Sequence, residues 1–127
     1  MSDFLAASEG PDTYTPIQLF AGDLPIVSEP GTLITGQNLL ANTVVARITL
    51  SGKLTQWAPA GSLGAQIPVG ILMHTTDATS ADKGCELYIA GVFNRAALVW
   101  PAAATEPQKA YAFDNTKIAT RYLGYSL

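Results

Sequence analysis

The side chains best suited to catalysis lie in one short stretch of the chain, ILMHTTDAT, and just after it. His74 is the only histidine, and Asp77 follows three residues later. Ser80 and Cys85 are the nearest candidate nucleophiles, and a histidine base must lie within hydrogen-bonding distance to activate either one. Because IPVGILMHT is typical of a short buried strand, His74 and Asp77 would point away from each other. We therefore predict a histidine that ends a strand, a loop shaped by Asp77, and no catalytic residue.

Other kinds of site lack their sequence signatures. Cys85 is the only cysteine, which excludes an intramolecular disulfide and a multi-cysteine metal site. The stretch GSLGAQ lacks the Gly-Lys-Thr/Ser ending of a phosphate loop and the third glycine of a dinucleotide turn. The acidic residues show no calcium-loop spacing, and nothing selects a glycosidase pair among them. We therefore expect no metal, no cofactor and no enzyme activity.

The composition predicts one folded domain with a surface poor in charge. Of the 127 residues, 48% are hydrophobic and 13% are charged, whereas about 25% charged is typical of globular proteins. We infer that part of the surface is buried against copies of the chain or against a partner. The net charge of −3 argues against broad contact with nucleic acid. No apolar run approaches the ~20 residues of a membrane helix, and the N-terminus does not resemble a secretory signal, so we expect a soluble protein without a membrane partner.

Residues 1–31 differ from the rest of the chain and are expected to form an extended arm. Their four prolines and three glycines oppose a helix and leave little room for regular sheet. Apolar side chains on a segment that cannot fold alone indicate docking on another surface, for example as an added strand formed by residues 2–20. The side chains expected to make this contact are Phe4, Leu5, Tyr14, Ile17, Leu19 and Phe20.

Residues 32–127 are expected to form a compact domain that is mainly β. Alternating apolar residues, a turn at Ser51-Gly52 and the returning run KLTQW predict a hairpin over residues 44–57. The runs IPVGILMHT and CELYIAGVF predict two more strands joined by a loop, and KIATRYLGYSL predicts a last strand at the C-terminus.

Two short helices and two tryptophans complete this prediction. Asn94 is a candidate cap for a helix over RAALVW, and the spacing of Thr105 and Gln108 predicts a capping box for a second helix. Trp57 ends the hairpin beside a loop rich in proline and glycine, so we favour an interface there over a core position. Trp100 precedes a proline that ends the first helix, and we expect it in the core.

Four motifs follow one another in the second half of the chain: VGIL at 69–72, the DATS loop, GVF at 91–93 and LVWP at 98–101. On these motifs, the chain from about residue 33 onward resembles the small head decoration, or capsid-stabilising, proteins of lambda-type bacteriophages. These motifs occur in the order found in the family and are followed by AAATEPQKAYAF. The stretches GQNLLANTVVARIT and SGKLTQW are also similar to the broader family. The N-terminal arm departs from the family pattern, because it is richer in prolines and apolar residues.

The resemblance implies a bent β-ribbon or incomplete barrel with one or two short helices. It also implies a homotrimer on three-fold positions outside the expanded capsid, bound to the major capsid protein. Such a trimer would help the shell to resist the pressure of packaged DNA. The protein would be a late protein, present in the host cytoplasm during assembly and then on the outer surface of the virion.

Two other functions remain open from the sequence. A trimeric β module of a phage tail or fibre would bind a host glycan by stacking Trp57, Tyr88 or Tyr122 on the sugar. A small hydrolase would depend on His74, and it ranks last because a lone histidine forms no catalytic constellation.

Overall fold

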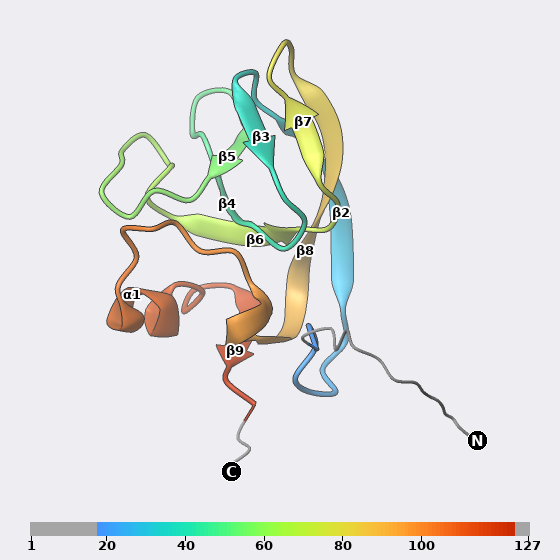
Figure 1. The fold of residues 1–127 in the computed structure, drawn as a ribbon, viewed down its shortest axis with the longest axis vertical. Coiled ribbons are helices and arrows are strands. Elements are labelled where there is room, and N and C mark those ends of the chain that lie inside the picture. Colours follow the sequence, from blue (N-terminus) through green and yellow to red (C-terminus); the bar gives the residue numbers. More distant parts are fainter. Residues whose placement is uncertain (1–17, 124–127) are drawn as a thin grey trace, which may run out of the picture.

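A computed structural model describes residues 18–123 of the chain, and its sheet forms a small barrel (Figure 1). The strands are β2 (Val27–Leu33), β3 (Gln37–Leu39), β4 (Val44–Arg47), β5 (Leu54–Gln56), β6 (Pro68–Leu72), β7 (Thr76–Ala78), β8 (Lys83–Asn94) and β9 (Lys117–Arg121). The helices are the 3-10 helix η2 (Arg95–Ala97) and the α-helix α1 (Glu106–Tyr111). The mainly β fold class is therefore confirmed.

The larger sheet has six strands in the order β2-β5-β4-β6-β8-β9, and an additional pairing of β2 with β8 closes five of them into a barrel. Strand β8 is the longest, with 12 residues. One edge of β8 pairs with β2, antiparallel. Its other edge pairs with two strands in succession, antiparallel with β6 and then parallel with β9. Strands β3 and β7 form a separate two-stranded sheet. Within residues 18–123, no helix is long and apolar enough to cross a membrane.

Most of the predicted elements are confirmed. Strands β4 and β5 form the expected hairpin, with Val45 opposite Gln56. The Asn94 side chain accepts a hydrogen bond from the Ala96 amide and caps η2, which is a 3-10 helix rather than an α-helix. Thr105 and Gln108 form both hydrogen bonds of the predicted capping box at α1.

Strand β7 lies where only a loop was predicted. Its three residues pair with β3, with Asn38 opposite Asp77. A strand of three residues is too short to show an alternating pattern, and the surrounding TDATSADKG has the composition of a loop. The pairing with β3 is therefore decided by tertiary contacts, not by local sequence.

Strand β2 crosses the boundary that the sequence suggested between residues 31 and 32. It pairs with β8 from Val27 to Leu33, although Pro30 lies in its middle. Pro30 is opposite Glu86, whose carbonyl instead accepts the Met73 amide at 2.9 Å. Pro30 and Glu86 therefore form a pair without main-chain hydrogen bonds, so the missing N–H of proline removes no hydrogen bond from the sheet. Part of the segment expected to be an arm is thus a wall of the barrel.

The core consists of two groups of buried side chains, which lie on opposite faces of β4 and β6 because neighbouring residues of these strands belong to different groups. The first contains Val44, Ala46, Trp57, Ile71, Phe93, Leu98, Phe113 and Ile118. The second contains Leu33, Leu39, Val45, Leu54, Leu72, Ala78 and Leu87. Side chains of β4, β6 and β8 contribute to both groups, so these three strands are covered by core side chains of both groups.

Trp57 belongs to this core and is not an exposed anchor. Only 4% of it is exposed, its indole nitrogen donates to the Gln66 carbonyl at 2.9 Å, and its ring centroid lies 6.0 Å from that of Trp100. The position of Trp57 at the end of a hairpin, beside a loop rich in proline and glycine, suggested a place on the surface. Instead, that loop folds back over the indole ring. Trp100 is partly buried against the same group, which agrees with its expected core position.

Close packing between β6 and β8 makes Gly70 sensitive to substitution. A Cβ at this position would lie 2.7 Å from the Tyr88 carbonyl oxygen and 2.6 Å from the Leu87 side chain. We expect Gly70→Ala to lower the free energy of unfolding by about 2 kcal/mol or more, because backbone must move to relieve the overlap. Gly84→Ala is the matched control, since a Cβ there meets no atom within 4 Å. Urea unfolding monitored by circular dichroism measures both, and equal stability of the two variants would contradict the packing.

Candidate binding surface

The residues that could have formed a catalytic centre shape a loop instead. His74 is exposed just after β6, and its carbonyl accepts a hydrogen bond from the Thr76 hydroxyl at 2.8 Å. Asp77 accepts hydrogen bonds from the Thr79 amide and hydroxyl, which hold the pKa of its carboxyl group below the usual range. Among the hydrogen bonds of residues 18–123, none joins the His74 ring to Ser80 or Cys85, so no base and nucleophile are paired there.

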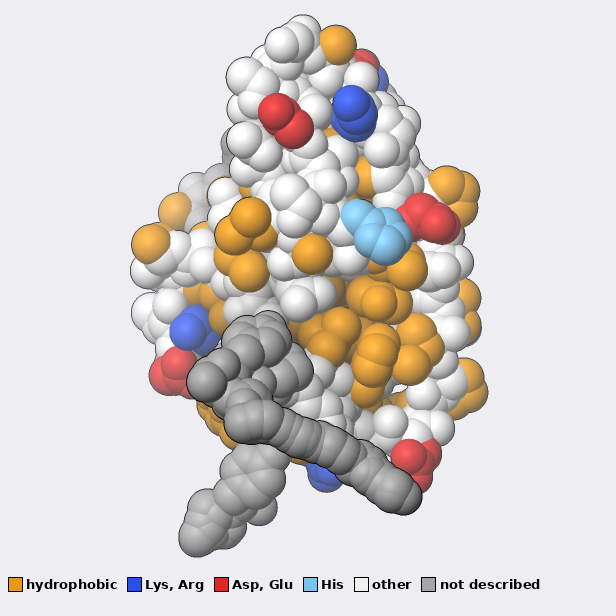
Figure 2. Space-filling view, turned by 45° about the vertical axis from the view of Figure 1, so that its right-hand side comes forward, with side chains coloured by type: hydrophobic (Ala, Val, Ile, Leu, Met, Phe, Trp, Pro, Cys, Tyr) orange, Lys and Arg blue, Asp and Glu red, His pale blue; other side chains and the backbone are white. Residues whose placement is uncertain are grey.

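Cys85 is half-buried, and this burial raises the pKa of its thiol. A raised pKa disfavours the thiolate, which is the reactive form. The thiol lies at the edge of an open hollow of about 650 Å³ that also contains His74, Asp77, Gly84 and Glu86. Figure 2 shows the histidine beside apolar side chains on this face. In the described part of the chain, no group of three or more His, Cys, Asp or Glu residues could hold a metal ion.

The side chains expected to contact a capsid divide into two sets. Phe4, Leu5, Tyr14 and Ile17 lie outside the described residues. Leu19 and Phe20 are described, and both are packed against the first core group rather than projecting from the domain. The Phe20 ring centroid lies 5.4 Å from that of Phe93 and 5.7 Å from that of Tyr88. Phe20 therefore has its binding partner within its own chain.

Backbone hydrogen bonds fix this segment to the end of β8. The Asn94 amide donates to the Leu19 carbonyl at 2.6 Å, and the Asn94 side chain donates to the Gln18 carbonyl at 2.7 Å. The Ala21 amide donates to the Val92 carbonyl at 3.0 Å. No pattern in residues 18–21 predicts these contacts, because their partners are more than 70 residues away in the sequence.

Three exposed apolar residues follow this attachment. Leu24, Ile26 and Val27 are 57%, 47% and 45% exposed, and we call them the arm-root strip. Ile26 lies over Gly91, where a Cβ would come within 3.3 Å of its side chain. Three neighbouring exposed apolar residues are typical of a contact surface. In the sequence, this strip corresponds to the run LPIV at 24–27. The predicted contact residues did not include it.

A comparison with protein families establishes the family of this chain. The family model of bacteriophage lambda head decoration protein D matches residues 13–120. The chain belongs to this family. The match confirms the resemblance seen from residue 33 onward and extends it upstream to residue 13. No curated protein matches the chain.

Membership of the head decoration family gives the chain a general role. The family consists of structural proteins of the phage head, so this chain is a capsid protein of the virion surface. The surface contacts of the domain are therefore the features of interest for this role.

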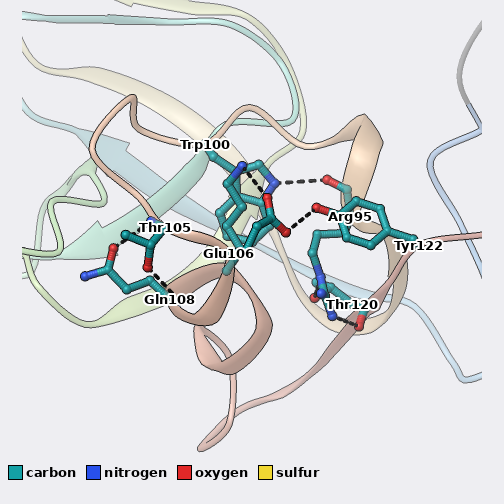
Figure 3. Close-up of polar contacts among 8 residues, drawn as sticks. Arg95, Trp100, Thr105, Glu106, Gln108, Thr120 and Tyr122 are labelled. Carbon is teal, nitrogen blue, oxygen red and sulfur yellow. Dashed lines mark hydrogen bonds and ion pairs between the residues drawn. The ribbon is translucent and has the colours of Figure 1, made fainter.

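Polar contacts tie the end of β9 to α1 in this head decoration protein (Figure 3). The Arg95 guanidinium group donates to the Thr120 carbonyl at 2.9 Å and lies 5.0 Å from the centroid of the Tyr122 ring. The Tyr122 hydroxyl donates to the Glu106 carboxylate at 2.8 Å, and Lys109 pairs with the same carboxylate at 3.3 Å. Through these contacts, the pKa of Glu106 is lowered and the pKa of Tyr122 is raised.

These contacts bear on the glycan-binding alternative. Trp57 is buried, Tyr88 packs against Phe20 and Phe93, and Tyr122 is engaged by Arg95 and Glu106. The structure therefore does not bring the three candidate aromatic rings together as a sugar platform. No observation on the described residues favours glycan binding over decoration of a capsid.

The contact between Tyr122 and Glu106 should make the effect of Tyr122→Phe depend on pH. The ionised Glu106 is the hydrogen-bonded form, so its contribution is present at neutral pH and is lost as the pH falls through its lowered pKa. We expect Tyr122→Phe to have a lower Tm than the wild type at about pH 7 and the difference to shrink towards about pH 3.

Tyr111→Phe is the matched control, because Tyr111 is 68% exposed and its hydroxyl has no hydrogen bond among those of the described residues. Its Tm should follow that of the wild type throughout. A difference for Tyr122→Phe that is the same at all pH values would contradict the hydrogen bond to a carboxylate.

Proposed function

We propose that this chain is a cement protein that binds the outside of the expanded capsid as a homotrimer at three-fold positions. It contacts the major capsid protein and stabilises the shell against the pressure of packaged DNA. The observation that carries this proposal is the family match over residues 13–120. The chain meets the shell from the host cytoplasm during assembly and remains on the virion surface.

The proposed arm ends where the chain becomes fixed to the domain. Gln18 and Leu19 are held by Asn94, so we assign the contact with a partner to residues 2–17. At about 3.3–3.6 Å per residue, this segment spans at most ~50–60 Å. That length allows it to reach a neighbouring capsid subunit and add a strand to one of its sheets.

In this proposal, main-chain hydrogen bonds of the added strand provide affinity, and apolar side chains provide specificity. Phe4, Leu5, Tyr14 and Ile17 are the side chains available for pockets on the shell. The arm-root strip continues this apolar surface onto the domain. Three arms on one trimer bind the same shell, so the second and third contacts form at high effective concentration.

The stabilising effect requires no chemical reaction. A protein that binds the expanded shell but not its precursor shifts the equilibrium towards the expanded state by mass action. The increase in shell stability is limited by the difference in affinity between the two states. Saturating decoration should therefore raise the temperature at which expanded shells release their DNA.

Deletion of residues 2–17 tests the proposed role of the arm. We expect this variant to keep the fold and stability of the wild type, because the contacts of Leu19 and Phe20 with the domain remain. It should lose binding to expanded shells in co-sedimentation, with unexpanded shells as the control surface. Undiminished decoration by this variant would show that the arm is not the contact.

Phe20→Ala is the complementary variant. It keeps residues 2–17 but removes a ring from the core, and we expect its free energy of unfolding to fall by about 2–3 kcal/mol. At a temperature where it remains folded, it should still bind expanded shells. The two variants together separate the contact with the capsid from the attachment of the segment to the domain.

A further inference from the structure

Two loops on one side of the domain carry no charged side chains. Lys, Arg, Asp and Glu are absent from residues 54–73 and 96–105, which supply the loop between β5 and β6 and the loop before α1. In Figure 1 these two loops lie on the opposite side of the domain from β2. The nearest cations, Arg47 and Lys53, are paired with Glu29 at 3.2 Å and with Asp82 at 2.6 Å.

Two exposed leucines project from this side. Leu50 and Leu63 are 90% and 69% exposed, and we call them the leucine knob. The Thr49 amide donates to the Leu63 carbonyl at 2.8 Å, which joins the two loops that carry the leucines. Leu63 has a φ of 60°, a conformation that residues with a Cβ avoid. The loop thus holds a large apolar side chain in solvent at a disfavoured backbone angle.

A hollow lies next to the leucine knob. It has a volume of about 570 Å³ between residues 57–61 and 101–103, and its lining includes Pro59, Pro101 and Ala102. Prolines and alanines lose little side-chain entropy when they are covered. The floor is fixed, because the Trp57 indole donates to the Gln66 carbonyl at 2.9 Å. The hollow is therefore a rigid, uncharged site for an apolar side chain.

We propose that the leucine knob of one copy packs into the hollow of the next copy, and that copies of the chain associate through this face. The inference rests on the homotrimer of the proposed function and names its contact. A partner selected by charge would need charged groups that these two loops lack, whereas an apolar projection and an uncharged hollow occur on the same chain. Such a head-to-tail contact uses two different patches of each copy, and it closes into a ring of three when successive copies are rotated by about 120°.

The test is the oligomeric state of the purified full-length chain, measured without capsids by sedimentation equilibrium. The wild type should be trimeric, and Leu63→Asp should weaken association about tenfold or more. Leu63→Gly provides a variant that keeps the fold, because glycine adopts a φ of 60° without strain. It should weaken association equally while unfolding no more easily than the wild type. Leu40→Asp is the matched control, because Leu40 is 62% exposed and lies outside the two uncharged loops. This variant should remain trimeric.

A mixing experiment tests the head-to-tail geometry. Ala102→Glu changes the hollow and leaves the knob intact, whereas Leu63→Asp changes the knob and leaves the hollow intact. At a concentration where the wild type is just trimeric, each variant alone should be mainly monomeric. A mixture of the two should form dimers, because one intact knob meets one intact hollow, but these dimers cannot close into a ring.

Trimers that persist in both Leu63 variants would overturn the inference, and so would a wild type that stays monomeric at all concentrations tested. Absence of dimers in the mixture would overturn the head-to-tail arrangement. Binding of the wild type to expanded shells is measured separately by co-sedimentation. Failure of that binding would overturn the proposed function, while a trimer that depends on Leu63 would leave this contact standing.

Discussion

The pairing of β2 with β8 is the constraint on which the rest of the structure depends. It closes the barrel and brings residues 27–33 against residues 83–90, so that Leu33 of β2 and Leu87 of β8 join the same core group. The other edge of β8 holds β6 and then β9, which positions α1 and the contacts around Tyr122. Without this closure, the sheet would have two open edges, which could pair with another chain.

Asn94 connects this barrel to the proposed binding surface. Its side-chain oxygen accepts the Ala96 amide at the start of η2, while its two nitrogen donors hold the carbonyls of Gln18 and Leu19. One residue at the end of β8 thus sets both the turn that leads to the C-terminal part and the point from which the N-terminal segment leaves. The attachment of residues 18–21 is thus defined by distant residues of the domain rather than by their own sequence.

Local sequence patterns predicted the elements that depend on neighbouring residues. Alternation identified the hairpin of β4 and β5, and the spacing of Thr105 and Gln108 identified the start of α1. Such signals fail where the deciding partner is distant. Pro30 argued against a strand, but it lies opposite a carbonyl that is turned towards β6, and this is visible only once the barrel is closed.

The candidate site shows the same limit. Composition correctly singled out the N-terminal segment as unusual, but it could not show that Phe20 belongs to the core beside Phe93. Trp57 was assigned to an interface because of the loop beside it, and the loop covers the ring instead. In both cases the apolar side chain lies in a segment without a regular hydrophobic pattern, and it packs against distant residues of its own domain. A single sequence does not specify such distant partners.

The bond between Asn94 and Leu19 also orders events during synthesis. The Leu19 carbonyl is held by a residue made 75 positions later, and β2 likewise waits for β8 before it can pair. Contacts between such distant residues form late, after the intervening chain has been released. A nascent or truncated chain that lacks β8 therefore has no fixed origin for its N-terminal segment. In the proposed function, a chain therefore has to complete its barrel before it can present this segment to a shell, which would keep incomplete chains off the particle.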